Sequence, residues 1–360
     1  MEDDTMTDFE TLRDAYKNKT LTIYLGAGVS MGSGLPSWDA LVLAMYFKVM
    51  DQQRLGRWRP YPNYLLAIAE WQLNHLHEPL EISARKIRRH FQGKEEKFRD
   101  SMWETLYEGF QPPEGTEFRP PDCSYLRNGN PTLQSIVELC TSRPEGKVKS
   151  VVTYNYDSLL ESALNDIPHK PIWTADGRPS VSQIPVYHVH GYVPFDKKEG
   201  SAPEDIVFTE DQYNRVASDP YSWANLVQIH CMSSSVGLMI GLSLSDRNMR
   251  RLFDAVRSTP IATQHFALLQ RPQWNVPDDT ELDRIHKNAK DYLEKFERSG
   301  VKRSPGEKGP NWRHEIAGIL QEVQSRGTEQ EEQVLFELGI EPIWYDKHSE
   351  IPGKLRKIYE

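Results

Sequence analysis

The chain has few cysteines, no long apolar run and no excess of basic residues. Its three cysteines, Cys123, Cys140 and Cys231, are far apart and form no C-x-x-C pair, which argues against a disulfide framework and a zinc ribbon. No apolar run approaches the roughly 18 residues that a membrane-spanning helix needs. The acidic start MEDDTMTDFE also lacks the basic residues of a signal peptide. Together these absences predict a cytoplasmic protein.

The charge balance points away from nucleic acid. The chain has 43 Lys and Arg against 52 Asp and Glu, a net charge of -9, and so offers no general basic field for phosphate backbones. We also find no carboxylate cluster suited to two metal ions, so a nuclease ranks last among the functions considered. The content of 38% hydrophobic and 26% charged residues is typical of a globular protein.

The order of predicted elements indicates an α/β fold. Segments with strand character alternate with helical or loop segments, as in a doubly wound, mostly parallel sheet. Residues 38–140 have a helical pattern, interrupted by a connection rich in Gly, Pro and Asn at 109–131. We therefore predict a sheet domain made of residues 1–37 and 146–360, with a helical insertion at 38–145. The predicted strands are residues 21–25, 148–153, 185–189, 236–240, 265–269 and 341–345.

A glycine turn follows the first predicted strand. Residues 26–30 read GAGVS and precede a helix, a place where backbone N–H groups and a helix dipole can meet a dinucleotide pyrophosphate. The fingerprint G-x-G-x-x-G of hydride-transfer enzymes is not complete, because Met31 stands where the third glycine would be. A tight strand-to-helix turn without a ligand is the structural alternative.

Two polar side chains follow the second strong strand. Asn155 and Asp157 alternate with tyrosines in the segment TYNYD at 153–157, at the strand end where open α/β sheets place their ligand groups. An amide and a carboxylate on one side of the chain can hydrogen-bond a ribose or an attacking water. Asp157 has an alternative role as the cap of a helix that starts near Ser158.

Two histidines end the next predicted strand. His188 and His190 lie in YHVHG at 187–191, and either can face the cleft as an acid or base near neutral pH. A half-buried histidine bonded to a carbonyl is the structural alternative. We predict no metal, because no nearby Cys, His, Asp or Glu supplies a third ligand to this pair.

The segment GLSLSD at 241–246 ends another apolar strand. Its hydroxyls and N–H groups can meet the adenosine ribose or a phosphate. Ser245 or Asp246 can equally serve as a helix cap.

These motifs together resemble the sirtuin-like family in residue choice, order and spacing. They are GAGVS with Gly34-Leu35-Pro36, then TYNYD, HVHG and GLSLSD. The closing segment IWYD at 343–346 is similar to the end of sirtuin-like domains in bacterial anti-phage defence proteins. The resemblance covers residues 21–36 and 148–270 and implies a Rossmann-like domain with NAD as the substrate.

The resemblance also implies roles for individual residues. Asn155, Asp157 and His190 form the catalytic group, with His190 as the base, and whether His188 assists it stays open. The resemblance places the NAD phosphates at Gly26, Ala27, Gly28 and Ser30, the nicotinamide ribose at Asn155 and Asp157, and the adenosine side at Gly241 and Ser243. Pro36 also belongs to the set that binds NAD.

Two departures from the deacylating sirtuins decide the expected reaction. The chain has no four-cysteine zinc module, and Ser37-Trp38-Asp39 replaces the Asp-Phe-Arg that usually follows the proline. The shared first step, breakage of the bond between nicotinamide and ribose, remains. We therefore expect an NAD glycohydrolase in which water attacks the ribosyl carbon.

The defence proteins that this chain resembles stay inactive until infection and act as oligomers with partners. The resemblance therefore implies a homo-oligomer and a partner protein, for example a HerA-type ATPase or an Argonaute-like sensor. From the charge balance and the lack of a long apolar run we expect no direct nucleic acid and no membrane as partners. Two alternatives differ in class: an NAD-dependent protein deacylase, and a module that senses NAD or ADP-ribose without catalysis.

Overall fold

A computed structural model describes most of the chain. The described residues are 2–50, 63–108, 110, 129–141, 146–197, 200–259, 263–272, 278–284, 287–288 and 312–360. Most of the predicted connection at 109–131, Cys123 and the glycine and proline loop at 299–310 lie outside them.

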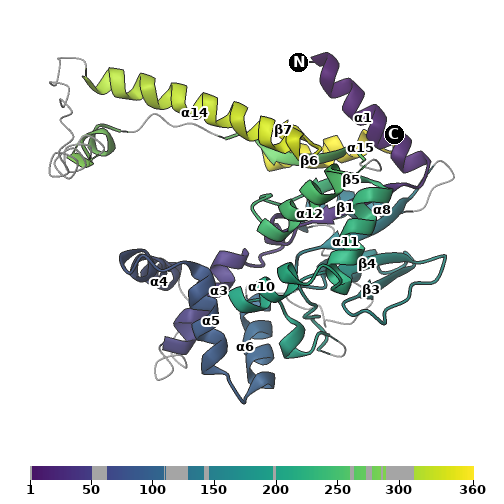
Figure 1. Ribbon diagram of the computed structural model, residues 1–360, viewed down its shortest axis with the longest axis horizontal. Coiled ribbons are helices and arrows are strands. Elements are labelled where there is room, and N and C mark those ends of the chain that lie inside the picture. The colour runs from purple at the N-terminus through teal and green to yellow at the C-terminus, as the bar shows by residue number, and fades with distance from the viewer. Residues whose placement is uncertain are drawn as a thin grey trace. The chain divides into compact units, whose positions relative to one another are not determined.

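The described residues form a seven-stranded sheet (Figure 1). All of its neighbouring strands are parallel, in the order β3-β4-β2-β1-β5-β6-β7. The predicted α/β class with a doubly wound, Rossmann-like sheet is confirmed. The strands are β1 (Leu21–Leu25), β2 (Val148–Thr153), β3 (His169–Ile172), β4 (Ile184–His188), β5 (Val236–Ile240), β6 (His265–Gln270) and β7 (Ile340–Tyr345).

The central strands are apolar on both faces because helices cover both sides of the sheet. β1 is buried at every position. One face packs on α1 (Glu2–Lys17), α8 (Pro131–Cys140), α9 (Leu159–Leu164) and α15 (Ile351–Arg356), with Leu12 and Tyr16 of α1 in the common core. On the other face, Cys231 of α11 (Trp223–Ser234) contacts Ser150 of β2, and Phe253 of α12 (Arg247–Arg257) contacts Tyr24 of β1.

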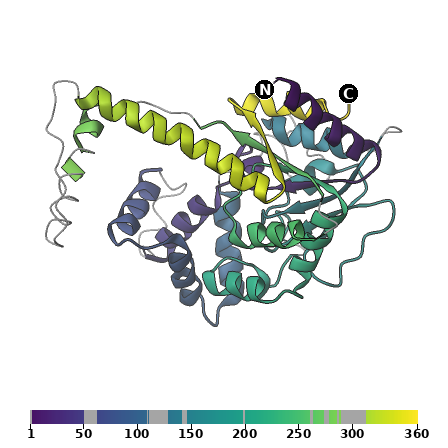
Figure 2. The ribbon, with the colours of Figure 1, turned by 45° about the horizontal axis from the view of Figure 1, so that its top comes forward.

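The two ends of the described chain lie side by side. Arg13 of α1 donates a hydrogen bond of 2.8 Å to the carbonyl of Lys357, which follows α15. Figure 2 shows these two helices together beside the labels N and C. The last helix, which follows the 3₁₀ turn η2 (His348–Glu350), therefore closes the core next to the first.

The region 38–140, predicted to be helical, forms helices in its described parts. They are α3 (Trp38–Met50), α4 (Asn63–His75), α5 (Leu80–His90) and α6 (Glu95–Tyr107). Further along the chain, the 3₁₀ turn η1 (Pro203–Asp205) leads to α10 (Glu210–Ser218), which begins with a capping box formed by Thr209 and Gln212.

The described chain divides into two compact units. The larger comprises residues 1–270 and 338–360, and the smaller comprises residues 271–337 with α14 (Trp312–Glu337). The helices at 38–140 thus belong to the same unit as the sheet, and the predicted boundaries at 37/38 and 145/146 stay a prediction. Across the described residues, every helix is too short or too polar to span a lipid bilayer.

Candidate functional site

The candidate site lies where the direction of strand order reverses. From β2 the chain adds β4 and β3 on one side of β1, and then returns to place β5 on the other side. Ligands of open α/β sheets bind at such a point, beyond the carboxyl ends of the strands. Here those ends carry the glycine turn after β1, the segment TYNYD after β2 and the segment GLSLSD after β5.

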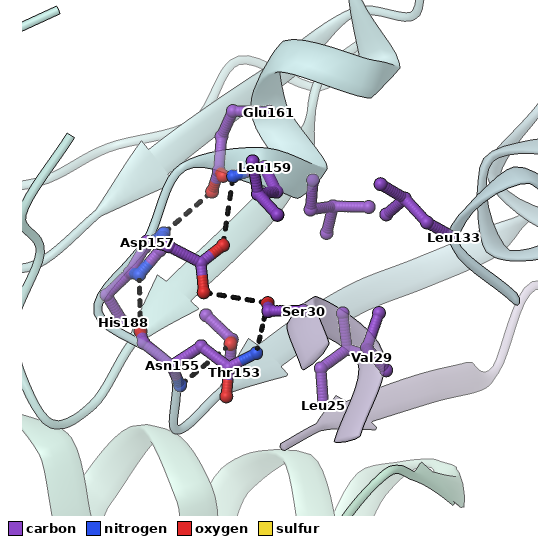
Figure 3. Close-up of a pocket in the computed structure, with 11 residues that line it drawn as sticks. Leu25, Val29, Ser30, Leu133, Thr153, Asn155, Asp157, Leu159, Glu161 and His188 are labelled. Carbon is purple, nitrogen blue, oxygen red and sulfur yellow. Dashed lines mark hydrogen bonds and ion pairs between the residues drawn. The ribbon is translucent and has the colours of Figure 1, made fainter. Parts of the chain in front are cut away.

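A small pocket at this edge brings three of the predicted residues together (Figure 3). Ser30, Asn155 and Asp157 line it, with His188, Glu161 and apolar side chains around them. The Asn155 amide donates to Ser30 Oγ over 3.1 Å, and that hydroxyl donates to Asp157 Oδ2 over 2.7 Å. The turn after β1 and the segment after β2 are therefore joined by a continuous chain of hydrogen bonds.

The orientation of the Asn155 side chain follows from its neighbours. Its Nδ2 lies 3.0 Å from the carbonyl oxygen of Gly26, which can only accept a hydrogen bond. The nitrogen must therefore face the glycine turn, and its two N–H groups are used by Gly26 and Ser30. What Asn155 can offer a ligand is its carbonyl oxygen Oδ1, an acceptor.

Asp157 combines its two predicted roles. Its Oδ1 accepts the backbone N–H of Leu159 at 3.0 Å in the first turn of α9, while Oδ2 accepts from Ser30. Burial raises the pKa of this carboxyl above its usual value, and the hydrogen bonds from Ser30 and Leu159 offset that effect only in part. The carboxyl is 6% exposed, so charge on it is felt strongly by whatever occupies the pocket.

His188 closes the pocket from β4 and is paired with an acid from α9. Its Nδ1 lies 3.2 Å from the carbonyl oxygen of Asn155, and its Nε2 lies 2.6 Å from Glu161 Oε1. A carbonyl only accepts, so Nδ1 carries a hydrogen and a further proton lies between Nε2 and Glu161. The pair fixes the backbone of Asn155. The other carboxylate oxygen of Glu161, Oε2, is buried and has no hydrogen-bond partner among the described residues.

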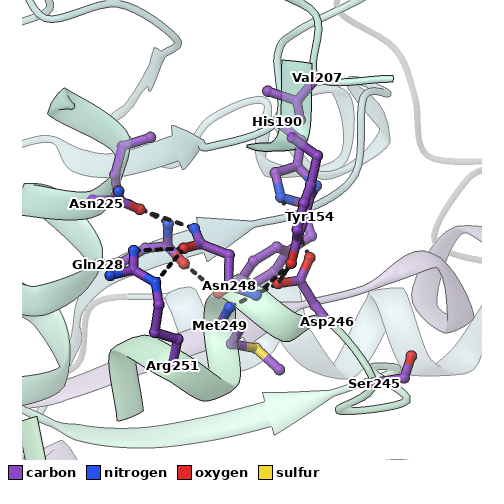
Figure 4. A network of polar contacts seen from close by, with 12 residues as sticks. Tyr154, His190, Val207, Asn225, Gln228, Ser245, Asp246, Asn248, Met249 and Arg251 are labelled. Carbon is purple, nitrogen blue, oxygen red and sulfur yellow. Dashed lines mark hydrogen bonds and ion pairs between the residues drawn. The ribbon is translucent and has the colours of Figure 1, made fainter. Parts of the chain in front are cut away.

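His190 lies outside this pocket, in a neighbouring polar network (Figure 4). β4 ends at His188, and the chain then turns, with the N–H of Gly191 donating to the His188 carbonyl over 3.3 Å. The two histidines therefore point to different surroundings. The His190 ring meets the edge of Tyr154 and has Nε2 3.6 Å from Asp246 Oδ2. Burial lowers the pKa of His190 below its usual value, and the Asp246 carboxylate partly counteracts this.

The glycines of the turn after β1 are needed because the backbone there lies against the end of β5 and the residue that follows it. The N–H of Gly28 donates to the carbonyl of Gly241 over 3.0 Å, and the N–H of Gly26 donates to Ile240 over 3.1 Å. A Cβ on Gly26 would lie 2.4 Å from the Gly241 oxygen. Gly241 itself has φ of +67°. Two of the amides predicted to hold phosphate thus bind the β5 loop, and the phosphate role of this turn stays a prediction.

The other predicted ligand positions lie along the same edge of the sheet. Ala27 and Pro36 are half-buried around the glycine turn, and Ser243 is exposed, with its hydroxyl 2.7 Å from that of Ser245. Asp246 caps α12, as its alternative interpretation predicted, by accepting the N–H of Met249 at 2.7 Å.

Sequence reasoning did not find Glu161 as a partner of His188. Glutamate on an amphipathic helix is usually solvent-exposed, and no local pattern distinguishes this one. Within the described parts of the chain, no group of three or more His, Cys, Asp or Glu side chains is placed to hold a metal ion.

Comparison with known proteins identifies the type of domain. A family model described as SIR2-like domain matches residues 149–295. Over these residues the chain is similar to a SIR2-like domain. The match covers Asn155, Asp157, His188, His190 and Asp246, and begins after the glycine turn. It confirms the resemblance to the sirtuin-like family and supports an NAD-related function and an NAD-utilising enzyme. A search of curated proteins finds no match.

Proposed function

We propose that this protein is an NAD glycohydrolase, which converts NAD⁺ and water into ADP-ribose, nicotinamide and a proton. The observation that carries the proposal is the chain of hydrogen bonds through Asn155, Ser30 and Asp157 at the strand edge of a SIR2-like domain. It holds an amide and a carboxyl group in fixed positions beside the switch point of the sheet, where dinucleotides bind in such folds.

In the proposed reaction the bond between C1′ of the ribose and the nicotinamide nitrogen breaks. The bonding electron pair goes to the pyridinium nitrogen, so nicotinamide leaves as a neutral molecule through an oxocarbenium-like transition state. The oxygen of water then bonds to C1′, and the proton of that water passes to His190. Much of the rate comes from positioning of the two reactants.

The contacts of each residue support a separate role in this reaction. Asn155 has both N–H groups engaged, so its Oδ1 accepts a hydrogen bond from the attacking water or a ribose hydroxyl. Asp157 lies behind it and, when ionised, stabilises positive charge on the ribosyl group. Burial disfavours the charged imidazolium of His190, which keeps this side chain in the neutral form that a base needs.

NAD breakdown by the purified protein tests the proposal. We expect the native chain, alone or with lysate of phage-infected cells, to release nicotinamide, and Asn155→Ala and His190→Ala each to reduce the rate at least about a hundredfold. Matched controls are Asn74→Ala and His230→Ala, which remove the same side chains from exposed helical positions. Equal rates in the site variants and the controls would refute the proposal.

The same assay separates the other two functions. Nicotinamide release that requires an acylated peptide would instead identify a protein deacylase. Tight binding of ADP-ribose with no turnover, alone or with infected lysate, would identify a sensing module.

We further propose that the activity serves anti-phage defence in the cytoplasm by depleting NAD, and that a partner protein and assembly into an oligomer control it. Constant NAD hydrolysis would kill the cell, so a triggered enzyme is the form compatible with growth. The sirtuin-like resemblance supports this setting. NAD content of cells that express the native chain or Asn155→Ala, measured before and after infection, tests it. A fall only in infected cells with the native chain is expected.

A further inference from the structure

Asp246 has one carboxylate oxygen committed to structure and one directed to His190 (Figure 4). Oδ1 accepts the N–H of Met249 at 2.7 Å and the hydroxyl of Tyr213 at 2.9 Å. These two bonds fix the plane of the carboxylate. Oδ2 is then the atom that lies 3.6 Å from His190 Nε2, within ion-pair distance.

The loop before Asp246 takes unusual backbone conformations to place it there. Gly241 has φ of +67°, and Leu244, which is not a glycine, has φ of +56° while its side chain is buried. A residue with a Cβ is strained in this region of backbone conformation. Arg250 donates to the Leu244 carbonyl over 3.2 Å and holds the turn. The fold thus maintains a strained loop that brings Asp246 to His190.

His190 is also enclosed from its other sides. The N–H of Val207 donates to the His190 carbonyl over 2.8 Å and fixes its backbone. The ring meets Tyr154 edge-on at 5.1 Å between centroids, and the Tyr154 hydroxyl is held by Gln228 over 2.6 Å. Tyr213 of α10 provides a second edge at 6.4 Å.

We propose that Asp246 is a positioning residue for His190, orienting its imidazole and stabilising the imidazolium that forms when His190 takes a proton from water. The proposal rests on the glycohydrolase function above. A carboxylate beside Nε2 favours the tautomer with hydrogen on that nitrogen, which leaves the lone pair of Nδ1 to accept the proton. A helix cap alone needs only one acceptor oxygen, and Oδ1 already provides it.

The titratable groups that face His190 come from three elements. They are Tyr154 after β2, Tyr213 on α10 and Asp246 at the start of α12, with Arg247 next to it. Burial raises the pKa of both tyrosines well above the neutral range, so they stay uncharged there. Asp246 is therefore the group whose charge can change the titration of His190.

The variant Asp246→Asn separates positioning from capping, because asparagine caps helices as well as aspartate does. We would follow the ring resonances of histidine-labelled protein by NMR against pH, and assign His190 by the signal that His190→Gln removes. The same variant is assayed for NAD breakdown across pH. Asp254→Asn is the matched control, since it removes one carboxylate from an exposed position of α12.

We expect Asp246→Asn to lower the pKa of His190, to shift the acidic limb of kcat/KM to lower pH and to reduce kcat/KM at least about tenfold. Asp254→Asn should leave the His190 titration unchanged. An unchanged His190 titration in Asp246→Asn would overturn the proposal even if the native chain hydrolyses NAD. A changed titration in a chain that never hydrolyses NAD would support the pairing and reject the glycohydrolase, so the two failures are distinguishable.

Discussion

At the scale of single residues, the site depends on a hydrogen-bonded histidine and glutamate held away from water. His188 and Glu161 have side chains only 1% and 8% exposed, with 2.6 Å between Nε2 and Oε1. Taking such groups out of water is costly, and removal of one partner leaves the other buried and uncompensated. The pair also fixes Asn155 through its carbonyl, so stability and site geometry are connected here.

We therefore predict that Glu161→Gln and His188→Gln each lower the free energy of unfolding by about 3 to 5 kcal/mol. The double variant should lose less than the sum of the two, because neither group is then left without its partner. Urea unfolding of the four proteins measures the coupling. His169→Gln, at a half-buried histidine that contacts the Ile167 carbonyl, serves as the control, and additive losses would show that the pair is not coupled.

Another buried histidine, His265, makes the stability of the protein depend on pH. His265 is 2% exposed, and its Nδ1 accepts the N–H of Gly237 over 3.0 Å. Burial lowers its pKa to about 4, below the value of about 6.5 in an unfolded chain. Between these two pKa values the unfolded state binds more protons than the folded state. Stability due to His265 is therefore complete above about pH 6.5 and is lost as the pH falls towards 4.

We predict that the native chain loses about 2 kcal/mol more stability between pH 7 and pH 5 than His265→Gln does. Urea unfolding of both proteins at both pH values gives the two losses of stability. Their difference is due to His265, because the other titratable groups are the same in both proteins. The exposed His230→Gln should retain the native pH dependence. Equal pH dependence in native protein and His265→Gln would mean that the fold does not lower the pKa of His265.

The residues of the site were only partly predictable from the sequence. Asn155 and Asp157 follow a strong strand, and their position at its carboxyl end was enough to bring them to one edge. The partners of the histidines were not readable, because Glu161 and Asp246 come from other elements that only the tertiary fold places. The direction of each histidine depended on the turn that begins at His188, where the strand ends.

At the scale of elements, the turn after β1 and the loop after β5 are locked together by glycine. The Cβ of an alanine at Gly241 would lie 2.7 Å from the Val29 nitrogen, and φ there is +67°. Asn130, the N-cap of α8, strengthens the same turn by donating to the Val29 carbonyl over 2.7 Å. The backbone that holds Ser30 thus depends on two neighbours distant in sequence.

We predict that Gly241→Ala lowers the free energy of unfolding by at least about 2 kcal/mol, because both the conformation and the close contact oppose a side chain. NAD breakdown should fall with it, since Ser30 moves with the turn. Gly353→Ala in α15 is the matched control: its Cβ would meet nothing within 4 Å, and a helical alanine stabilises by up to about 1 kcal/mol. Thermal unfolding compares the two variants. Equal stability of Gly241→Ala and Gly353→Ala would show that the contact between the turn and the loop does not require glycine.

Six of the seven strands were predicted within one residue at each end, since they are apolar runs that end at turns. The strand that was not predicted, β3, is four residues long, reads HKPI and is mostly half-exposed. An edge strand pairs on one side only and tolerates Pro and Lys, so its sequence does not differ from that of a loop. The four helices from α3 to α6 lie within the region 38–140 that was predicted to be helical.

At the scale of the whole molecule, every residue of the candidate site belongs to the larger compact unit. The contacts through Ser30, Asn155, His188 and Asp246 lie within residues 1–270. The sequence did not indicate that residues 271–337 form a separate unit, because no local pattern distinguishes helices that pack on the sheet from helices that do not. A ligand at the site should therefore act on the two units differently.

We predict that ADP-ribose, the product, slows amide hydrogen exchange at residues 25–31, 153–161 and 241–246, and leaves α14 unchanged. A ligand that binds only the folded state stabilises the segments it contacts, and exchange reports the opening of each segment separately. Exchange followed by mass spectrometry, with and without ADP-ribose, measures this. The Asn155→Ala variant should lose most of the protection. Equal protection across α14 and the three segments would mean that the two units open together and that the site is not confined to the larger one.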